Sequence, residues 1–508
     1  MSPKTSKEQF EKAKESISKA WICMKETVKN LCELLFKWTK TAIYGLDGTD
    51  RWIGSKIEAK NLNLFDIICL GFGGAIGSGI FVLMGSGINF TGRSIVLAVG
   101  VGCLFMLLAY FYNVLLSSMF TFKGGDYSQK AITFNPFFSG ISAYVNFTNG
   151  FSIAMYSIAI INYASIIFPT LLDYSQIIAI LIITLLFAAT IRGSKFISTI
   201  NSIMTVILII SIFIFIVFGV SKVQSGYFSE GNFFRNGFSG FISAIAIMGW
   251  ACQGTTMGPV AVSAVTKKAK KNIPLGILLV TVLLAVVYFA MSYVAAGVLP
   301  IEEVSNKNLS LVAKEIFPYW IFVIFIIGGA VFAIATSMIT AITMVRYPIL
   351  KVAEDGWLPK ICKKTTSSGY PWVVYLIFYI VSIVPVLLGF SLDVIVSLVM
   401  IPYMITNIYC NLACIRIINK YPKQWENSIL HMPKILIDII CILAALSALI
   451  VCYNLFILLD KSQMLLMLGI LFLMSIFSII SIKTGNVSIE NLEKNKEIII
   501  QEALNEED

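Results

Sequence analysis

The sequence predicts an all-α polytopic membrane protein with about twelve transmembrane helices, and three observations lead to this fold class. Hydrophobic residues make up 57% of the 508-residue chain and charged residues only 13%, and the mean hydropathy is +0.85. Apolar runs repeatedly reach the roughly 20 residues that a helix needs to cross a bilayer. Lysine and arginine gather in every second connection between these runs, as they do in loops on the cytoplasmic face of a membrane protein.

The apolar spans follow one another through most of the chain. We place them near residues 63–88, 94–118, 136–167, 175–191, 197–220, 238–264, 275–299, 319–345, 372–390, 393–415, 433–457 and 462–482. The connections after the second, fourth, sixth, eighth and tenth spans are the basic ones, so the positive-inside rule predicts that both termini are cytoplasmic. An even number of spans agrees with this topology, and a plasma-membrane location is expected.

The chain divides into three parts at the ends of the spanning region. Residues 1–62 form a basic amphipathic segment, residues 63–484 form the twelve-helix domain, and residues 485–508 form a short charged tail that is either a solvated helix or disordered. In the first segment, apolar residues recur every seven positions from Phe10 to Trp38, with lysines between them. This pattern predicts a helix on an anionic membrane surface. A self-associating coiled coil is the alternative.

The first span contains a glycine-rich stretch, Gly71-Phe-Gly-Gly-Ala-Ile-Gly-Ser-Gly-Ile-Phe81. Each glycine costs a helix roughly 1 kcal/mol relative to alanine, so the helix is expected to break here. Broken backbone is tolerated at membrane depth only where it faces a cavity. A ligand with both charges would then bind the amides of Ser78 and Gly79 with its carboxylate and carbonyls near Ala75 with its ammonium, as in an amino acid. Close packing between helices is the alternative role for these glycines.

The sixth span is interrupted in a similar way. It holds three glycines and a proline within eleven residues, Gly249, Gly254, Gly258 and Pro259, which predicts a second broken helix. Two interrupted spans five apart indicate two inverted five-helix repeats, in which helices 1 and 6 are discontinuous. Helices 11 and 12 would follow the second repeat. The substrate site would lie at the interface between the two repeats.

Five motifs occur in order along the spanning region. They are Gly74-Ala-Ile-Gly-Ser-Gly-Ile-Phe81, Gly124-Gly-Asp-Tyr127, Gly193-Ser-Lys195, Trp250 to Gly254 followed by Lys271-Asn-Ile-Pro274, and Arg346-Tyr-Pro-Ile-Leu-Lys-Val-Ala-Glu-Asp-Gly-Trp-Leu-Pro359. Together they resemble the signatures of the amino acid/polyamine/organocation superfamily of permeases. The resemblance covers essentially the whole spanning region, and it implies a secondary transporter that moves amino acids by alternating access.

Carried over residue by residue, the resemblance implies a substrate site on the two interrupted spans. The amides of Ser78 and Gly79 would hold the substrate carboxylate, and carbonyls near Ala75, Trp250 and Gln253 would hold its ammonium. Trp250 would also stack over the substrate as a gate, with a buried packing aromatic as the alternative. The complete implied set is Gly74, Ala75, Ile76, Gly77, Ser78, Gly79, Trp250, Gln253 and Gly254.

The sequence departs from the family's pattern at residues that bear on coupling. Thr255-Thr256 stands where many members carry Phe-Glu, and span 5 near Ile207 lacks the lysine that in some relatives substitutes for a bound sodium. The acids that we find in the spans are Asp66, Asp393 and Asp438. None of the three is expected at the site, although buried acids normally mark proton paths in membranes.

Three coupling modes therefore stay open: exchange or facilitated diffusion, proton coupling, and sodium coupling. Thr336 and Ser337 in span 8 are a candidate cation site, because their hydroxyls would lie beside the first break. The alternative is that each hydroxyl bonds its own helix. Asn146 and Asn149 in span 3 either face the pocket or bond between helices. The missing acid weakly favours neutral or apolar substrates over a cationic amino acid or a polyamine.

Other classes of function are less compatible with the sequence. The ten cysteines are scattered without paired spacing, and no set of nucleophile, base or metal ligands converges, so neither an enzyme nor a cofactor or metal site is expected. The net charge of +10 lies mainly in the basic connections, which fits a membrane surface rather than nucleic acid. The rival function is a non-transporting amino-acid sensor or scaffold that retains a permease body.

Overall fold

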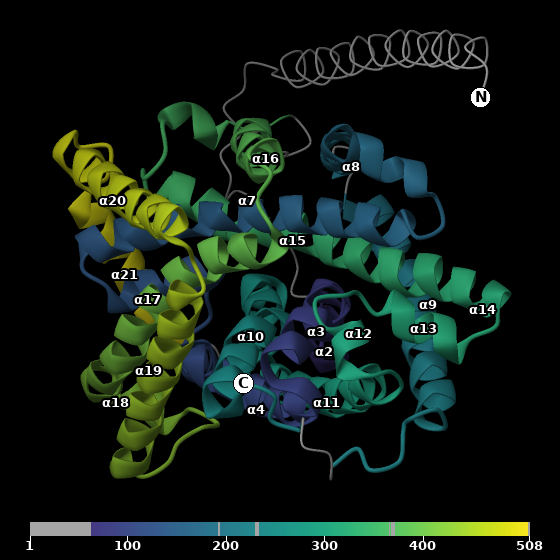
Figure 1. Cartoon of the computed structure of the whole chain (residues 1–508). Helices are drawn as coiled ribbons and strands as arrows, with labels where there is room; N and C mark the ends of the chain where they lie inside the picture. The colour runs from purple at the N-terminus through teal and green to yellow at the C-terminus, as the bar shows by residue number, and fades with distance from the viewer. Residues whose placement is uncertain (1–61, 191–193, 229–232, 365, 367–370, 506–508) are drawn as a thin grey trace, which may run out of the picture.

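The computed structural model describes residues 62–190, 194–228, 233–364, 366 and 371–505, and the chain folds into α-helices over nearly all of this part, without a β-strand (Figure 1). Eight helical segments of the described chain are long and apolar enough to cross a membrane. These findings confirm the all-α polytopic fold class. The basic segment over residues 1–62 lies, except for Leu62, outside the described residues.

Each predicted span corresponds to one helix or to consecutive helices. In chain order these are α2 (Leu64–Ala75) with α3 (Ser78–Thr91), α4 (Ile95–Ala109) with α5 (Phe111–Met119), α7 (Pro136–Ala164), α8 (Ser175–Thr190), α9 (Ser194–Val220), α10 (Gly237–Ala261), α11 (Ala269–Gly297), α14 (Tyr319–Ile324) with α15 (Phe332–Glu354), α16 (Trp372–Leu387), α17 (Leu392–Lys420), α19 (Lys434–Ile457) and α20 (Lys461–Lys483). Shorter helices connect or follow them: α6 (Gly125–Thr133), α12 (Ile301–Val304), α13 (Ser310–Ile316), α18 (Pro422–Glu426) and α21 (Ile489–Asn505). A π-helical turn over Phe325–Val331 joins α14 to α15.

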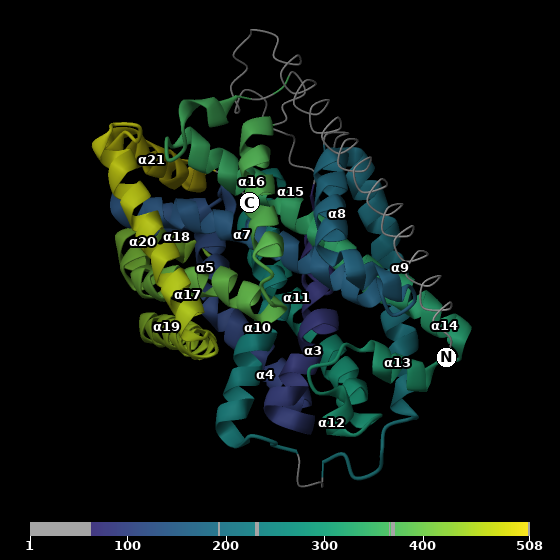
Figure 2. The same ribbon diagram turned by 45° about the horizontal axis from the view of Figure 1, so that its top comes forward.

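The long helices form two groups that cross. Helices α7 and α15 lie side by side and run across a group made of α2, α3, α4, α10 and α11 (Figure 1). Helices α8, α9 and α16 pack onto α7 and α15, and α17, α19 and α20 flank one side (Figure 2). Helix α10 is buried along most of its length, as expected for a helix that is apolar all round. The candidate site lies where α10 faces α7 and α15.

The first break is present between α2 and α3. Helix α2 ends at Ala75, the backbone is extended at Ile76, and α3 begins at Ser78. A Cβ added at Gly77 would lie 1.9 Å from Ser337 Oγ and 2.4 Å from the carbonyl oxygen of Ala333. Since α15 approaches the break this closely, only glycine fits at position 77.

The second break is not present, and the expectation of a discontinuous helix 6 is wrong for this structure. Helix α10 continues from Gly237 to Ala261 with Pro259 inside it. A proline this near the end removes a single helical hydrogen bond from a short final stretch. The glycines instead allow close approach of neighbours, because a Cβ at Gly254 would lie 2.6 Å from the carbonyl carbon of Gly74. The glycines of α10 therefore allow close packing between helices.

The charged tail forms α21, which rests against the helical body instead of standing free in solvent. Its side chains Leu492 and Ala503 are buried. Lys123 Nζ lies 3.0 Å from Glu502 Oε1, and Lys270 Nζ donates to the carbonyl oxygen of Ala503 at 3.1 Å. Helix α21 is thus tied both to the connection before α6 and to the start of α11.

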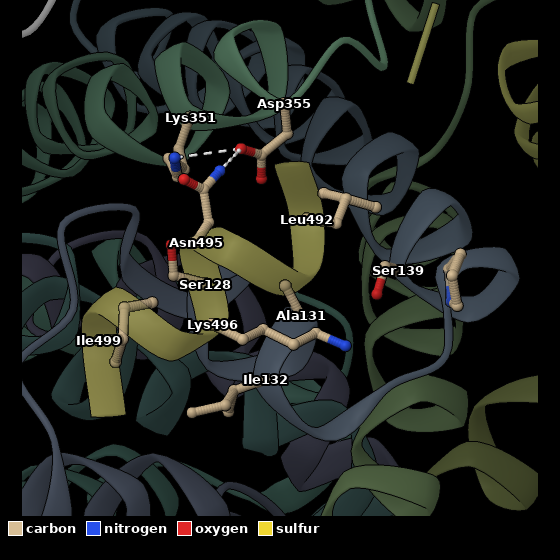
Figure 3. Close-up of a pocket in the computed structure, with 11 residues that line it drawn as sticks. Ser128, Ala131, Ile132, Ser139, Lys351, Asp355, Leu492, Asn495, Lys496 and Ile499 are labelled. Carbon is tan, nitrogen blue, oxygen red and sulfur yellow. Dashed lines mark hydrogen bonds and ion pairs between the residues drawn. The ribbon is translucent and has the colours of Figure 1, made fainter. Parts of the chain in front are cut away.

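The same helix meets the end of α15 at a small cavity (Figure 3). Asn495 Nδ2 donates to Asp355 Oδ1 at 3.0 Å, and the same carboxylate oxygen lies 3.0 Å from Lys351 Nζ. Burial acts to lower the pKa of Lys351, but the charges of Asp355 and Glu354 outweigh it and raise that pKa above its usual value. Lys351 therefore stays charged, and its ion pair with Asp355 fixes the carboxylate that α21 contacts.

Candidate functional site

The candidate site is a cavity between α10 and the crossing helices α7 and α15. It encloses about 750 Å³ of empty space including its open mouth, against about 370 Å³ for the cavity under α21 and about 220 Å³ for one between α15 and α16. Its lining comes from five helices: Gly74 of α2, Asp126 of α6, Asn146, Asn149, Ser152 and Tyr156 of α7, Trp250, Gln253, Gly254, Met257 and Ala261 of α10, and Ser337, Thr340, Ala341, Val345 and Pro348 of α15.

The structure brings part of the sequence-predicted set to this cavity. The predicted residues that line it are Gly74, Trp250, Gln253, Gly254 and Ser337, and the two asparagines of span 3 line it as well. Trp250 is buried, and its ring lies against that of Tyr156 with the centroids 6.3 Å apart. The side-chain oxygen Oε1 of Gln253 is buried and has no hydrogen-bond partner among the described residues, so the cavity wall offers an unused acceptor.

The rest of the predicted set lies behind this lining. Of the described residues, Ala75, Ile76, Gly77 and Gly79 are absent from the lining, as is Thr336; the side chain of Ser78 lies outside the described part of the structure. The reason is that α10 covers the start of α3: a Cβ at Gly79 would lie 2.1 Å from Ala251 Cβ and 2.2 Å from Ala251 Cα. The amides of the first turn of α3 have no partner further back in their own helix, and α10 packs directly against this turn at Gly79.

The carbonyl oxygen of Ala75 already has a protein partner. The hydroxyl of Tyr288, on α11, donates to it at 2.7 Å and lies 3.1 Å from the carbonyl oxygen of Ala251. A carbonyl oxygen has two lone pairs, so it can accept a second donor. Tyr288 therefore joins the end of α2 to α10 at the break.

Tyr288→Phe is expected to lower amino-acid uptake about tenfold while the protein stays folded, because one hydroxyl serves two buried carbonyls at the break. The initial rate of uptake into proteoliposomes, with thermal unfolding in detergent, would measure this. Tyr453→Phe on the exposed side of α19 is the control and should match the wild type. A lower melting temperature with unchanged uptake would show that Tyr288 only supports the fold.

The two hydroxyls of the candidate cation site differ in their surroundings. Thr336 Oγ1 donates to the carbonyl oxygen of Ala333 in its own helix at 2.8 Å, so this hydroxyl bonds its own helix. Ser337 lines the cavity and lies against Gly77 at the break. Of the pair, Ser337 alone is therefore placed at the cavity.

The sequence reasoning missed an acid in the cavity wall. Asp126 lines the cavity, and its Oδ2 lies 2.9 Å from Lys130 Nζ, with side chains 3% and 0% exposed. The Gly124-Gly-Asp-Tyr127 motif lies between the second and third predicted spans, so its acid is not among those found in the spans. The signal available was the spacing of four between Asp126 and Lys130 on a short helix.

The three acids that the sequence did single out serve other purposes. Asp66 accepts the backbone N–H of Asn63 in a capping box at the start of α2. Asp393 accepts from Ser86 Oγ at 3.3 Å, and Asp438 pairs with Lys434 on α19. None of the three lines the cavity.

A helical bundle that spans the membrane around a polar cavity, with a broken helix beside it, is the architecture of a membrane transport protein. Comparison with known proteins makes the assignment specific. The chain belongs to the amino acid permease family, because the family model described as "Amino acid permease" matches residues 62–481. It is a transporter and not an enzyme.

The chain is similar to several curated transporters of this kind. It is 26% identical to the branched-chain amino acid permease BcaP of Bacillus subtilis, over 60% of this chain and 70% of the relative. It is 25% identical to the methylthioribose transporter of the same organism and 25% identical to the cadaverine/lysine antiporter of Escherichia coli, each over 62% of this chain and 71% of the relative. The names of these relatives give branched-chain amino acids, methylthioribose, and cadaverine with lysine as their substrates.

Proposed function

We propose that this protein is a secondary transporter that moves amino acids across the membrane by alternating access around the cavity between α10, α7 and α15. The observation that supports the proposal is that the end of α2, next to the break, meets α10 at a cavity with several polar side chains in its wall. Gly74 at the end of α2 and Trp250, Gln253 and Gly254 on α10 all line it. The names of the relatives, which include an amino acid permease and a cadaverine/lysine antiporter, support this class of substrate.

In this proposal the substrate is bound mainly by backbone groups at the break. Its carboxylate takes the amides of Ser78 and Gly79, and its ammonium takes carbonyls near Ala75, Trp250 and Gln253, with Trp250 closing over it as the gate. Because α10 covers the first turn of α3 in this structure, the carboxylate position requires α10 to move away from α3. Alternating access supplies that movement.

The topology and coupling are also part of the proposal. We place both termini in the cytoplasm and the protein in the plasma membrane, because the basic connections share one face. The N-terminal segment, residues 1–62, would lie on the anionic membrane surface. Coupling to sodium would place the ion beside Ser337 and Thr336, whereas exchange or proton coupling needs no such site.

Purified protein in liposomes should accumulate labelled amino acids, and this measurement tests the proposal. The panel should contain leucine, glutamine, lysine, glutamate and cadaverine, each measured with no gradient, with an imposed proton gradient, with an imposed sodium gradient, and with unlabelled amino acid trapped inside. Faster uptake in one arm identifies the coupling mode. Amino-acid binding without flux in every arm would instead support a sensor, and uptake of cadaverine alone would support a polyamine permease.

A further inference from the structure

We propose that the buried Asp126–Lys130 pair makes this cavity select amino acids with uncharged side chains, and that Lys130 is the internal cation that keeps Asp126 from recruiting a cationic substrate. The inference rests on the proposed function as an amino-acid transporter, and it adds the substrate class and the residues that set it. Lys130 acts through Asp126, so it is a positioning residue.

The pair is enclosed in protein and yet belongs to the cavity wall. Asp126 lines the cavity, while Lys130 follows one turn later on α6 and its side chain is fully buried. The hydroxyl of Tyr112 donates to Asp126 Oδ1 and lies 3.0 Å from Asn407 Oδ1. One oxygen of the Asp126 carboxylate therefore accepts a hydroxyl hydrogen bond, and the other forms the ion pair with the Lys130 ammonium.

Lys130 is held over aromatic faces that connect it to the cavity. Its Nζ lies 4.6 Å from the ring centroid of Tyr403 and 5.5 Å from that of Tyr112, a favourable position for a cation. The hydroxyl of Tyr403 accepts from Asn149 Nδ2 at 2.7 Å and lies 3.4 Å from Asn146 Oδ1, and both asparagines line the cavity. A polar network therefore runs from the cavity wall to the ion pair.

The charge balance of the wall gives the selectivity. Among the described lining residues, Asp126 is the one acidic or basic side chain, and Lys130 Nζ lies 2.9 Å from its Oδ2. A cationic side chain would have to displace Lys130, and an anionic one would approach a carboxylate at low dielectric. A neutral polar side chain meets neither obstacle, and it finds the unused Oε1 of Gln253 and the two asparagines in the same wall.

The free-energy cost of burying such an ion pair indicates that the pair has a function. Removing two charges from water is costly even when they are paired, and apolar residues of the same volume often replace such pairs without loss of stability. Here the acidic member of the pair lies in the wall of the proposed substrate cavity.

The test uses the full-length protein in liposomes and measures the ratio of lysine uptake to glutamine uptake. The wild type should prefer glutamine to both lysine and glutamate. Lys130→Met exposes the charge of Asp126 and should raise the lysine-to-glutamine ratio at least about tenfold. Asp126→Asn leaves a lone cation and should raise the glutamate-to-glutamine ratio instead. The double variant, which is neutral, should recover the wild-type ratios.

The control is Lys434→Met, which breaks an exposed pair with Asp438 of the same spacing on α19 and should change no ratio. Folded variants with wild-type ratios would overturn the inference, as would a wild type that prefers lysine. If the single variants do not fold, the substrate preference of the wild type and of the double variant still tests the inference. The inference predicts no gain of lysine uptake in the neutral double variant, so such a gain would contradict it. A wild type that moves no amino acid refutes the proposed function itself, which is a distinct outcome.

Discussion

Gly79→Ala is expected to abolish amino-acid uptake, the largest effect that we predict for a single methyl group. The added Cβ would lie 2.1 Å from Ala251 Cβ and 2.2 Å from Ala251 Cα, distances at which the two helices must separate. The backbone of Ala251 cannot move aside as a flexible side chain can. The added methyl group would therefore force α3 and α10 apart beside the proposed carboxylate site. The substitution therefore disturbs both the packing of the break and access to its amides.

Initial uptake rates, normalised to the amount of monodisperse protein in detergent, would measure this effect. The matched control is Gly100→Ala, a helical glycine of α4 whose added Cβ meets no atom within 4 Å. It should keep wild-type uptake, with equal or slightly higher stability because alanine favours the helix. If Gly79→Ala retained wild-type uptake, the close contact between α3 and α10 would not be required for transport.

Gly254→Ala is expected to reduce uptake to near background through a different contact. Its Cβ would lie 2.6 Å from the carbonyl carbon and oxygen of Gly74 and 2.7 Å from the amide nitrogen of Ala75. The collision moves α10 away from the end of α2, and both glycines line the cavity. The bond from Tyr288 to the carbonyl of Ala75 would be strained by the same movement.

The comparison for this variant is Gly73→Ala, in which the added Cβ lies 3.9 Å from its nearest neighbour, Thr205 Oγ1. Both variants would be assayed for substrate binding by thermal stabilisation with glutamine and for uptake into liposomes. Loss of uptake in Gly254→Ala with normal behaviour of Gly73→Ala supports a specific contact between α10 and the break. Equal losses in the two variants would indicate a general sensitivity of glycines on these helices.

Local composition was enough to place the spanning helices and the first break. The apolar runs correspond to helices because, in lipid, a segment must satisfy its own backbone hydrogen bonds. The first break could be predicted from five glycines within nine residues, Gly71 to Gly79. Each of them destabilises a helix by roughly 1 kcal/mol relative to alanine. The resemblance of five ordered motifs also led to the family that the comparison shows.

The second break could not be decided from composition. Gly249 and Gly254 were consistent with an interrupted helix and with a continuous helix packed closely on its neighbours. The outcome depended on what faces them: Met106 Sδ lies 2.8 Å from the position of a Cβ at Gly249, and Gly74 lies as close to Gly254. Those neighbours come from other helices, so no window of sequence around α10 contains the information.

The sequence by itself determined that this chain is a polytopic helical membrane protein with a break near Gly77, because hydrophobic length and glycine content act within a single segment, while the order of its motifs gave the resemblance to permeases. The tertiary structure alone decided that α10 is continuous and that Asp126 and Lys130 are buried at the cavity. Burial of an ion pair depends on which distant helices surround it. Here Tyr112 and Tyr403, far apart in the chain, are brought together around Lys130 only by the packing of α5 and α17 against α6.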